Sequence, residues 1–173
     1  RRALLRGGHV LVVGGGWIGL ETAAAARKIG CRVTIVEAAD RLCARVLPDS
    51  IARYLADLHG RHGIEIRLTA SAEGAEADTV VVGIGIQPNS ELAEAAGLAT
   101  SDGIVVDEFG VTSDPDIYAV GDVANLRGLR LESWANAQNQ AIAAAKSLLG
   151  RPTPYREVPW FWSDQHGVNI QVL

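Results

Sequence analysis

With 173 residues, 48% of them hydrophobic and 21% charged, the chain can bury a core and is not expected to be disordered. Its formal net charge of −4 argues against a nucleic acid partner, because binding phosphates requires a basic surface. No apolar run reaches the ~20 residues of a transmembrane helix, and no signal-peptide segment follows the N-terminal arginines, so no membrane association is expected.

The first half of the chain alternates between predicted strands and predicted helices. Short β-branched runs predict strands, an alanine-rich run before Gly30 predicts a helix, and Pro48 suits the first turn of another. The expected order is strand 9–13, helix 18–29, strand 32–37, helix 48–60 and strand 64–68. This alternation predicts an α/β fold with a parallel sheet, in which the first two strands are neighbours.

The second half of the chain shows less regular patterns. Residues 79–86 (TVVVGIGI) are continuously apolar, which predicts a strand buried on both faces. After it we expect a break at 87–89, a short helix at 91–96, strands between 103 and 122, a helix at 135–149, a proline-rich linker at 151–159 and a strand at 168–173.

The string GGGWIGLE after the first strand contains Gly-x-Gly-x-x-Gly at Gly14, Gly16 and Gly19. In this pattern the first glycine permits a tight turn, the second lets the backbone approach a pyrophosphate, and the third lets the helix pack closely on the strand. The helix is expected to begin near Ile18, and the free amides and dipole at this N-terminus, beside Trp17 and Ile18, favour an anion. The pattern predicts a Rossmann-like, dinucleotide-binding domain; a glycine-rich turn without a ligand is the alternative.

Glu37 ends the second predicted strand, close to the ~20-residue spacing after the glycines at which an acidic residue binds the adenosine ribose. A 2′-phosphate there would meet a like charge, so the sequence predicts NADH rather than NADPH. Ala38 and Ala39 add no cation, and Arg41, the nearby positive residue, is expected to face solvent.

The cysteines and histidines give no motif. Cys31 and Cys43 lie too far apart for Cys-x-x-Cys and are expected to be reduced, which favours the cytoplasm. Spacing does not cluster the histidines, at positions 9, 59, 62 and 166. No metal site, nucleophile or general acid is therefore predicted.

Five strings, GGGWIGLE, VTIVEAADRL, VVVGIGIQPN, DIYAVGD and PWFWSDQ, occur in that order. In them, and in ESWANAQNQ, the chain resembles the FAD-dependent ferredoxin reductases of the putidaredoxin reductase type. The resemblance implies electron transfer from NADH through FAD to a [2Fe-2S] ferredoxin. Rubredoxin, a quinone or nitrite remain alternative acceptors, and a nucleotide-binding fragment without turnover is a further alternative.

The resemblance also implies a division into three parts. Residues 1–97 match an internally shortened NAD-binding Rossmann domain, 98–150 the C-terminal part of an FAD-binding domain, and 151–173 a linker and the start of a C-terminal interface domain. Family members begin with an FAD half-domain that has its own glycine pattern. Because this chain lacks that pattern and contains no methionine, we expect it to be a fragment.

Four residues match the flavin side of the family. The resemblance implies that the Asp122 carboxylate accepts a hydrogen bond from a ribitol hydroxyl, and that the backbone of Trp134 lies by the flavin ring. Trp160 and Trp162 match aromatics on the ferredoxin-facing side, with Trp162 the better candidate for the electron route. A helix cap for Asp122 and hydrophobic packing for the tryptophans are the alternatives.

Three residues match the nicotinamide nucleotide side. Glu21 corresponds to a residue near the nicotinamide carboxamide, Arg45 to a position near the adenosine end, and Gly85 to the loop that crosses the dinucleotide. Alternatively, Glu21 is a first-turn partner of the helix dipole and Arg45 a solvated surface residue. An acidic ferredoxin is expected to be attracted by four arginines, at positions 127, 130, 151 and 156.

Overall fold

The computed structural model describes residue 2 and residues 4–173, which divide into two compact units. Unit 1 runs to Ile86 and also includes Ser163–Ile170, whereas unit 2 consists of Gln87–Trp162 and Gln171–Leu173. The first unit therefore ends before the predicted boundary at residue 97 and takes in part of the C-terminal segment. The assignment of each part to a cofactor stays a prediction.

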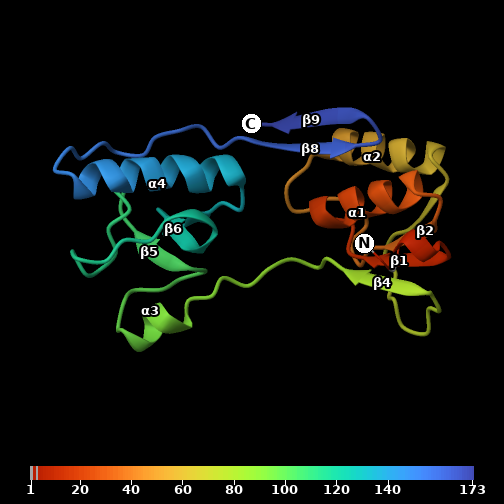
Figure 1. Cartoon of the computed structure of the whole chain (residues 1–173), viewed down its shortest axis with the longest axis horizontal. Helices are drawn as coiled ribbons and strands as arrows, with labels where there is room; N and C mark the ends of the chain where they lie inside the picture. Colours follow the sequence, from red (N-terminus) through yellow and green to blue (C-terminus); the bar gives the residue numbers. More distant parts are fainter. Residues whose placement is uncertain (1, 3) are drawn as a thin grey trace. The chain divides into compact units, whose positions relative to one another are not determined.

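Unit 1 is built on a parallel sheet with strand order β3-β2-β1-β4. Its elements are a 3-10 turn η1 (Leu4–Arg6), β1 (His9–Val13), α1 (Trp17–Lys28), β2 (Arg32–Val36), α2 (Asp49–Arg61), β3 (Ile64–Arg67) and β4 (Thr79–Val82). β2 pairs with β1 from His9 opposite Arg32 to Val13 opposite Val36, which confirms the predicted neighbours. Helices α1 and α2 lie on the same side of the sheet (Figure 1), as two right-handed crossovers in one direction require.

The core of unit 1 lies between the sheet and the helices. In β1, Val10, Leu11 and Val12 are all buried, so the central strand is covered on both faces. Helix α1 turns Leu20 and its small alanines toward the sheet, which lets helix and strand approach closely. Burying an aliphatic side chain of this size stabilises the fold by about 1.5–3 kcal/mol.

β4 is not buried on both faces, contrary to the prediction. It pairs with β1 at one edge of the sheet and ends at Val82, short of the predicted end at residue 86. Val80 and Val82 are 53% and 62% exposed. An apolar run identifies a strand, but which of its faces are covered depends on neighbouring elements that the run does not specify.

Unit 2 contains a small mixed sheet beside one long helix. Its elements are α3 (Glu91–Ala95), β5 (Ile104–Val106), a 3-10 turn η2 (Gly121–Val123), β6 (Ala124–Leu126), β7 (Leu129–Arg130) and α4 (Trp134–Leu148). β6 lies in the middle, parallel to β5 and antiparallel to β7. Val106, Ala119 and Ala124 form the buried centre of this unit.

A two-stranded hairpin, β8 (Phe161–Gln165) and β9 (Val168–Val172), follows an irregular segment at the predicted proline-rich linker. The predicted strand at 168–173 is therefore one arm of this hairpin. Its turn residues His166 and Gly167 have φ of 51° and 79°. Two positive φ values are typical of a tight two-residue hairpin turn.

Candidate functional site

The turn after β1 requires glycine at the first and third positions of the pattern. A Cβ added to Gly14, whose φ is +106°, would lie 2.3 Å from the Gly83 carbonyl oxygen. One added to Gly19 would lie 2.0 Å from the Gly14 carbonyl oxygen. Neither backbone atom can move without disturbing the fold. The close packing of β1, α1 and the end of β4 therefore requires glycine at these two positions.

Gly16 differs because a Cβ added there would meet nothing within 4 Å. It is the N-cap of α1, which begins at Trp17, one residue before the predicted start, and no side chain caps it. The first helical hydrogen bond runs from the Leu20 amide to the Gly16 carbonyl (2.9 Å). The amides of Ile18 and Gly19 precede that bond, so this helix end has the backbone donors and open approach that a phosphate requires.

Glu37 directly follows β2 and is half-buried beside the glycine turn. One carboxylate oxygen, Oε2, accepts a hydrogen bond from the Gly15 amide (2.6 Å). The other, Oε1, accepts one from the Ala39 amide (2.8 Å). A carboxylate has about four lone-pair positions, so Glu37 is oriented by the protein and can still accept bonds from a ligand.

Arg41 was expected to face solvent, but its side chain is held against the protein. Its side chain is only 36% exposed and forms ion pairs with Asp40 (3.3 Å) and Asp49 (3.2 Å). It also donates to the Ala44 carbonyl (3.0 Å). The Arg41 guanidinium is therefore held by groups of the protein. Arg41 is the basic residue that follows Glu37 most closely in the sequence.

The structure brings together two residues predicted to border the dinucleotide. Arg45 is exposed, and its Nη2 lies 3.4 Å from the position that a Cβ of Gly85 would take. Gly85 has φ of +115°, which only glycine adopts easily. The loop after β4 and the loop after β2 therefore approach each other at Arg45 and Gly85.

Glu21 does not lie in the first turn of α1, because the helix begins at Trp17. The expected alternative role as a first-turn dipole partner is therefore wrong. Its Oε1 accepts a 2.5 Å hydrogen bond from the hydroxyl of Ser163, a fully buried residue of β8. The hairpin residue thus orients the Glu21 carboxylate.

Ser163 is also part of a hydrogen-bonded network of polar side chains that was not predicted from the sequence. Gln165 Nε2 donates to Ser163 Oγ (2.9 Å), so its Oε1 faces and accepts from His59 Nε2 (2.8 Å). His59 Nδ1 then accepts from His166 Nε2 (3.3 Å), and His166 stacks on His62 with ring centroids 3.9 Å apart. Spacing along the chain gave no sign of this cluster, because His166 meets His59 and His62 only in the folded chain.

Two of the clustered histidines, His59 and His166, favour the neutral form. Burial lowers the pKa of His59, although its bond to Gln165 works in the opposite direction. Burial and the neighbouring His59 and His62 lower the pKa of His166 to about 4. Within the described part of the chain, no three potential metal ligands form a group able to hold an ion.

In unit 2, Asp122 is exposed in the turn η2, next to Gly121 with its φ of +75°. The N-cap of η2 is Val120, without a capping side chain, so the alternative role of Asp122 as a helix cap is not supported. Gln140 of α4 instead holds the turn, because its Oε1 accepts the Gly121 amide (2.7 Å).

In unit 2, Trp162 contacts two other tryptophans, Trp134 and Trp160. Trp134 opens α4 and is 67% exposed, and its ring meets Trp162 edge-on with centroids 6.1 Å apart. Trp162 in turn lies 5.0 Å from Trp160. Ser133 caps α4 by accepting the Asn136 amide (3.1 Å). The structure therefore groups the aromatic residues predicted for the flavin side.

The expected basic surface of unit 2 is largely neutralised. Arg127 and Arg156 both pair with Glu108, and Arg130 pairs with Asp102 and Glu132 while its side chain is only 9% exposed. Each of these three side chains has a carboxylate beside it, which reduces the local positive charge, and the attraction of an acidic partner stays a prediction.

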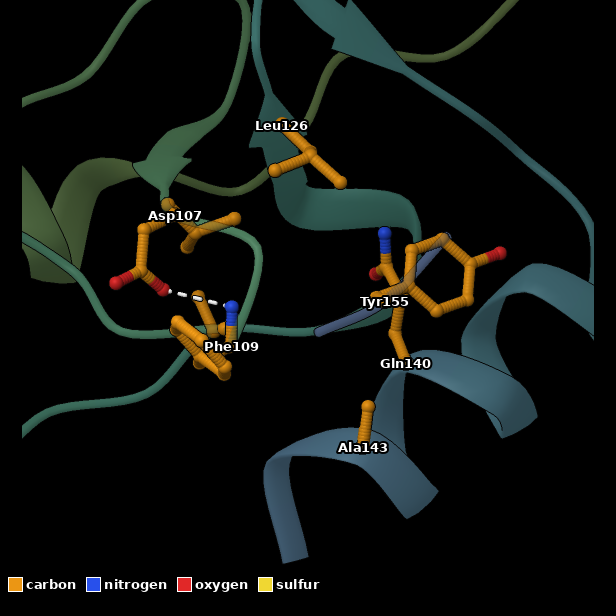
Figure 2. Close-up of a pocket in the computed structure, with 9 residues that line it drawn as sticks. Asp107, Phe109, Leu126, Gln140, Ala143 and Tyr155 are labelled. Carbon is orange, nitrogen blue, oxygen red and sulfur yellow. Dashed lines mark hydrogen bonds between the residues drawn. The ribbon is translucent and has the colours of Figure 1, made fainter. Parts of the chain in front are cut away.

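A small hollow in unit 2 is lined by Asp107, Phe109, Leu126, Gln140 and Tyr155, among others (Figure 2). Asp107 points its carboxylate at its own loop, where it accepts the amides of Phe109 and Val111. Most of the lining is apolar, so this hollow offers few groups to recognise a polar ligand.

No helix among the described residues is long and apolar enough to cross a bilayer.

The family model described as pyridine nucleotide-disulphide oxidoreductase matches residues 1–141. The ferredoxin--NAD(+) reductase component of the anthranilate 1,2-dioxygenase system of Burkholderia cepacia is 44% identical over 196 residues, covering 100% of this chain and 48% of that protein. That alignment is longer than this chain, so the relative has internal residues without a counterpart here. The chain spans about half the length of the curated relatives it matches.

Two solved structures are similar along nearly the whole chain. The ferredoxin reductase for the CYP199A2 system of Rhodopseudomonas palustris is 41% identical, with a TM-score of 0.91, over 98% of this chain and 48% of that one. Putidaredoxin reductase, in its covalent complex with putidaredoxin, is 38% identical, with a TM-score of 0.90, over 98% and 47% of the two chains. These findings confirm the resemblance to ferredoxin reductases and the α/β fold.

Proposed function

The chain belongs to the pyridine nucleotide-disulphide oxidoreductase family, and on that basis we propose that it provides the NADH-binding part of a reductase. This reductase passes electrons from NADH through FAD to a [2Fe-2S] ferredoxin of an oxygenase system. The similar ferredoxin reductases support this proposal, since they match across nearly all of the chain.

The observation that carries the proposal is the pairing of the glycine turn with Glu37. The open face at Gly16 and the N-terminal amides of α1 suit a pyrophosphate. Glu37, fixed beside the same turn, suits the ribose of an adenosine without a 2′-phosphate. In this proposal Arg45 lies near the adenosine end of the nucleotide, and Gly85 belongs to the loop that crosses the bound dinucleotide.

The flavin, when bound, supplies the hydride acceptance and the single-electron release. The residues of this chain bind and orient. Asp122, exposed beside the glycine of its turn, is available to accept a ribitol hydroxyl, and Trp134 opens the helix whose N-terminus would face the ring. A helix N-terminus there favours negative charge on the reduced ring. Trp162 contacts both Trp134 and Trp160, as a route from the flavin toward the acceptor would require.

The proposal is tested with the purified chain by calorimetry with ADP-ribose and by NADH-dependent reduction of a [2Fe-2S] ferredoxin in the presence of added FAD. Binding of ADP-ribose together with ferredoxin reduction supports it. Reduction of rubredoxin, a quinone or nitrite in preference to ferredoxin favours the alternative acceptors. Binding without any turnover favours a nucleotide-binding fragment, and absence of binding contradicts the NADH site.

We also propose a cytoplasmic location. Cys31 and Cys43 are both free and buried, and burial together with the charge of Glu37 raises the pKa of the Cys43 thiol to about 12. Reduced cysteines are usual in the cytoplasm. Fractionation of cells that express the natural gene tests this proposal, and recovery of the protein outside the cytoplasm would contradict it.

A further inference from the structure

A chain of hydrogen-bonded side chains connects α1, the hairpin and α2 within unit 1. Ser163 Oγ donates to Glu21 Oε1 (2.5 Å), and Gln165 Nε2 donates to Ser163 Oγ (2.9 Å). Gln165 Oε1 lies 2.8 Å from His59 Nε2. Ser163, Gln165 and His59 are all buried, whereas Glu21 is exposed. This hydrogen-bonded chain therefore joins the buried polar groups of the hairpin and α2 to a carboxylate at the surface of α1.

The Glu21 carboxylate fixes the direction of every bond in the hydrogen-bonded chain. An ionised carboxylate only accepts hydrogen bonds, so the Ser163 hydroxyl must give its one proton to Glu21. The Ser163 oxygen then accepts from the amide nitrogen of Gln165, which turns the Gln165 oxygen toward His59. His59 must therefore carry its proton on Nε2, and its Nδ1 accepts from His166 Nε2, 3.3 Å away. In the opposite direction Ser163 would donate to Gln165 and leave no proton for Glu21.

Glu21 lies one helical turn after the open N-terminus of α1. It follows Trp17 by four residues and Ile18 by three, so it shares a helix face with the start of the helix. Because helical side chains tilt toward the N-terminus, the Glu21 carboxylate points toward the end proposed for the pyrophosphate. Glu37 is proposed to hold the adenosine ribose, so Glu21 is left for the nicotinamide half. The carboxamide there is a neutral N–H donor, which a carboxylate accepts.

A surface glutamate without a partner loses considerable side-chain entropy when a ligand orders it. Ser163 holds Glu21 Oε1 in place before any ligand arrives. A carboxylate has about four lone-pair positions, so Glu21 keeps acceptor capacity for a ligand at a defined position. The ordering of this side chain therefore accompanies folding rather than binding, which raises the affinity for a ligand that uses it.

We propose that Ser163 and Gln165 are positioning residues for the nicotinamide end of the nucleotide: through the hydrogen-bonded chain they hold the Glu21 carboxylate where it accepts a bond from the carboxamide. This proposal rests on the proposed NADH site. The hairpin thereby contributes to a nucleotide site whose other residues belong to the first half of the chain. Because coupling between two sites is reciprocal, a bound nicotinamide also stabilises the hairpin.

The test uses two ligands that differ at the nicotinamide end. Calorimetry without FAD measures NADH and ADP-ribose, which shares the adenosine and the pyrophosphate but has no nicotinamide. Ser163→Ala is expected to weaken NADH about tenfold, the scale of one hydrogen bond to a charged group, and to leave ADP-ribose unchanged. Equal weakening of both ligands by this variant, or an unchanged affinity for NADH, would overturn the proposal.

Two further variants of β8 separate the hydrogen-bonded chain from the strand that carries it. Gln165→Leu removes the donor to Ser163 and is expected to weaken NADH in the same selective way, by a smaller factor. Asp164→Asn, between these two residues on the exposed face of β8, is the matched control and should change neither affinity. A selective loss of NADH in the Asp164 variant as large as that in Ser163→Ala would contradict the role of the hydrogen-bonded chain.

A measurement on the unaltered protein does not depend on the folding of any variant. NMR of the imidazole nitrogens reports which nitrogen of a neutral histidine carries the proton, and His59 is expected to carry it on Nε2. Protonation on Nδ1 would overturn the proposal, because Ser163 could not then donate to Glu21. Failure of the wild type to bind either ligand would instead contradict the proposed NADH site.

Discussion

Gln140 Oε1 accepts the backbone amide of Gly121 at 2.7 Å, joining the middle of α4 to the turn that carries Asp122. Both partners are buried, with Gln140 only 8% exposed. A Cβ on Gly121 would lie 3.2 Å from the Cβ of Ala137, so the turn packs tightly against the helix. The position of Asp122 therefore depends on a side chain almost twenty residues further along the chain.

Replacing Gln140 is expected to destabilise unit 2. Gln140→Leu keeps much of the side-chain volume but leaves the Gly121 amide buried without an acceptor, at a cost of about 1–3 kcal/mol. Denaturant unfolding followed by tryptophan fluorescence measures this cost, because three of the four tryptophans belong to unit 2. Gln138→Leu, an exposed position on the same helix, is the matched control and should change stability by less than about 0.5 kcal/mol. Equal effects of the two changes would contradict the role of Gln140.

The histidine cluster of unit 1 should make stability depend on pH. Because the folded pKa values of His59 and His166 are lower than their ordinary value of 6.5, the unfolded chain binds protons more readily. Their contribution is present above pH 6.5 and is lost as the pH falls toward 4, the folded value of His166. Thermal unfolding between pH 7.5 and 4 measures this loss.

His166→Asn separates the histidine effect from that of the carboxylates. Asparagine tolerates the positive φ of this turn position but does not titrate. The variant is expected to show a smaller fall in melting temperature between pH 6.5 and 4 than the wild type. Parallel pH profiles of variant and wild type would show that the cluster does not control stability in this range.

The purified chain is expected to hold FAD weakly or not at all. It contains one glycine pattern, at Gly14 to Gly19, and that pattern lies next to Glu37 in unit 1. The flavin side offers Asp122 and the tryptophans, but no second pyrophosphate-binding turn is apparent in the sequence. Absorbance near 450 nm after gel filtration with added FAD measures retention, and a stoichiometrically yellow chain would contradict the expectation.

Local sequence predicted much of unit 1. The β1–turn–α1 unit, the neighbouring β2 and the acidic residue at its end were all predicted, because each depends on residues close together in sequence. Helix starts were shifted by one residue at Trp17 and Trp134, which is the usual uncertainty of helix ends, although the Ser133 cap was a local signal for the second start.

Contacts between distant segments could not be predicted in this way. The edge position of β4, the meeting of His59 with His166 and the bond from Ser163 to Glu21 join residues far apart in the chain. Composition also overstated the basic surface, because the sequence lists arginines without showing that Glu108 or Asp102 lies beside them. The roles of the individual site residues stay predictions until ligands are measured.

The engagement of Arg41 leads to a prediction about cofactor choice. A 2′-phosphate would need a cation near Glu37, and Arg41 is the basic residue closest to it in sequence. Arg41 pairs with Asp40 and with Asp49, which lies in the first turn of α2, and donates to the Ala44 carbonyl, so several groups of the protein compete for its guanidinium. The chain should therefore bind ADP-ribose more tightly than its 2′-phosphorylated analogue.

Removing first the Glu37 carboxylate and then the Asp49 carboxylate should reverse the preference for ADP-ribose stepwise. Glu37→Ala removes the like charge and the ribose acceptors, so the preference for ADP-ribose should fall by about tenfold or more. Adding Asp49→Asn removes one of the two carboxylates that pair with Arg41 and leaves Asp40, so it should strengthen the phosphorylated analogue further, since a guanidinium with fewer partners binds phosphate better. Asp57→Asn, an exposed position on the same helix, removes the same charge at a distance and is the control. Calorimetry on the single and double variants measures each step. Equal binding of the two ligands by the wild type would contradict the role of Glu37, whereas a double variant identical to Glu37→Ala would show that Asp49 does not restrain Arg41.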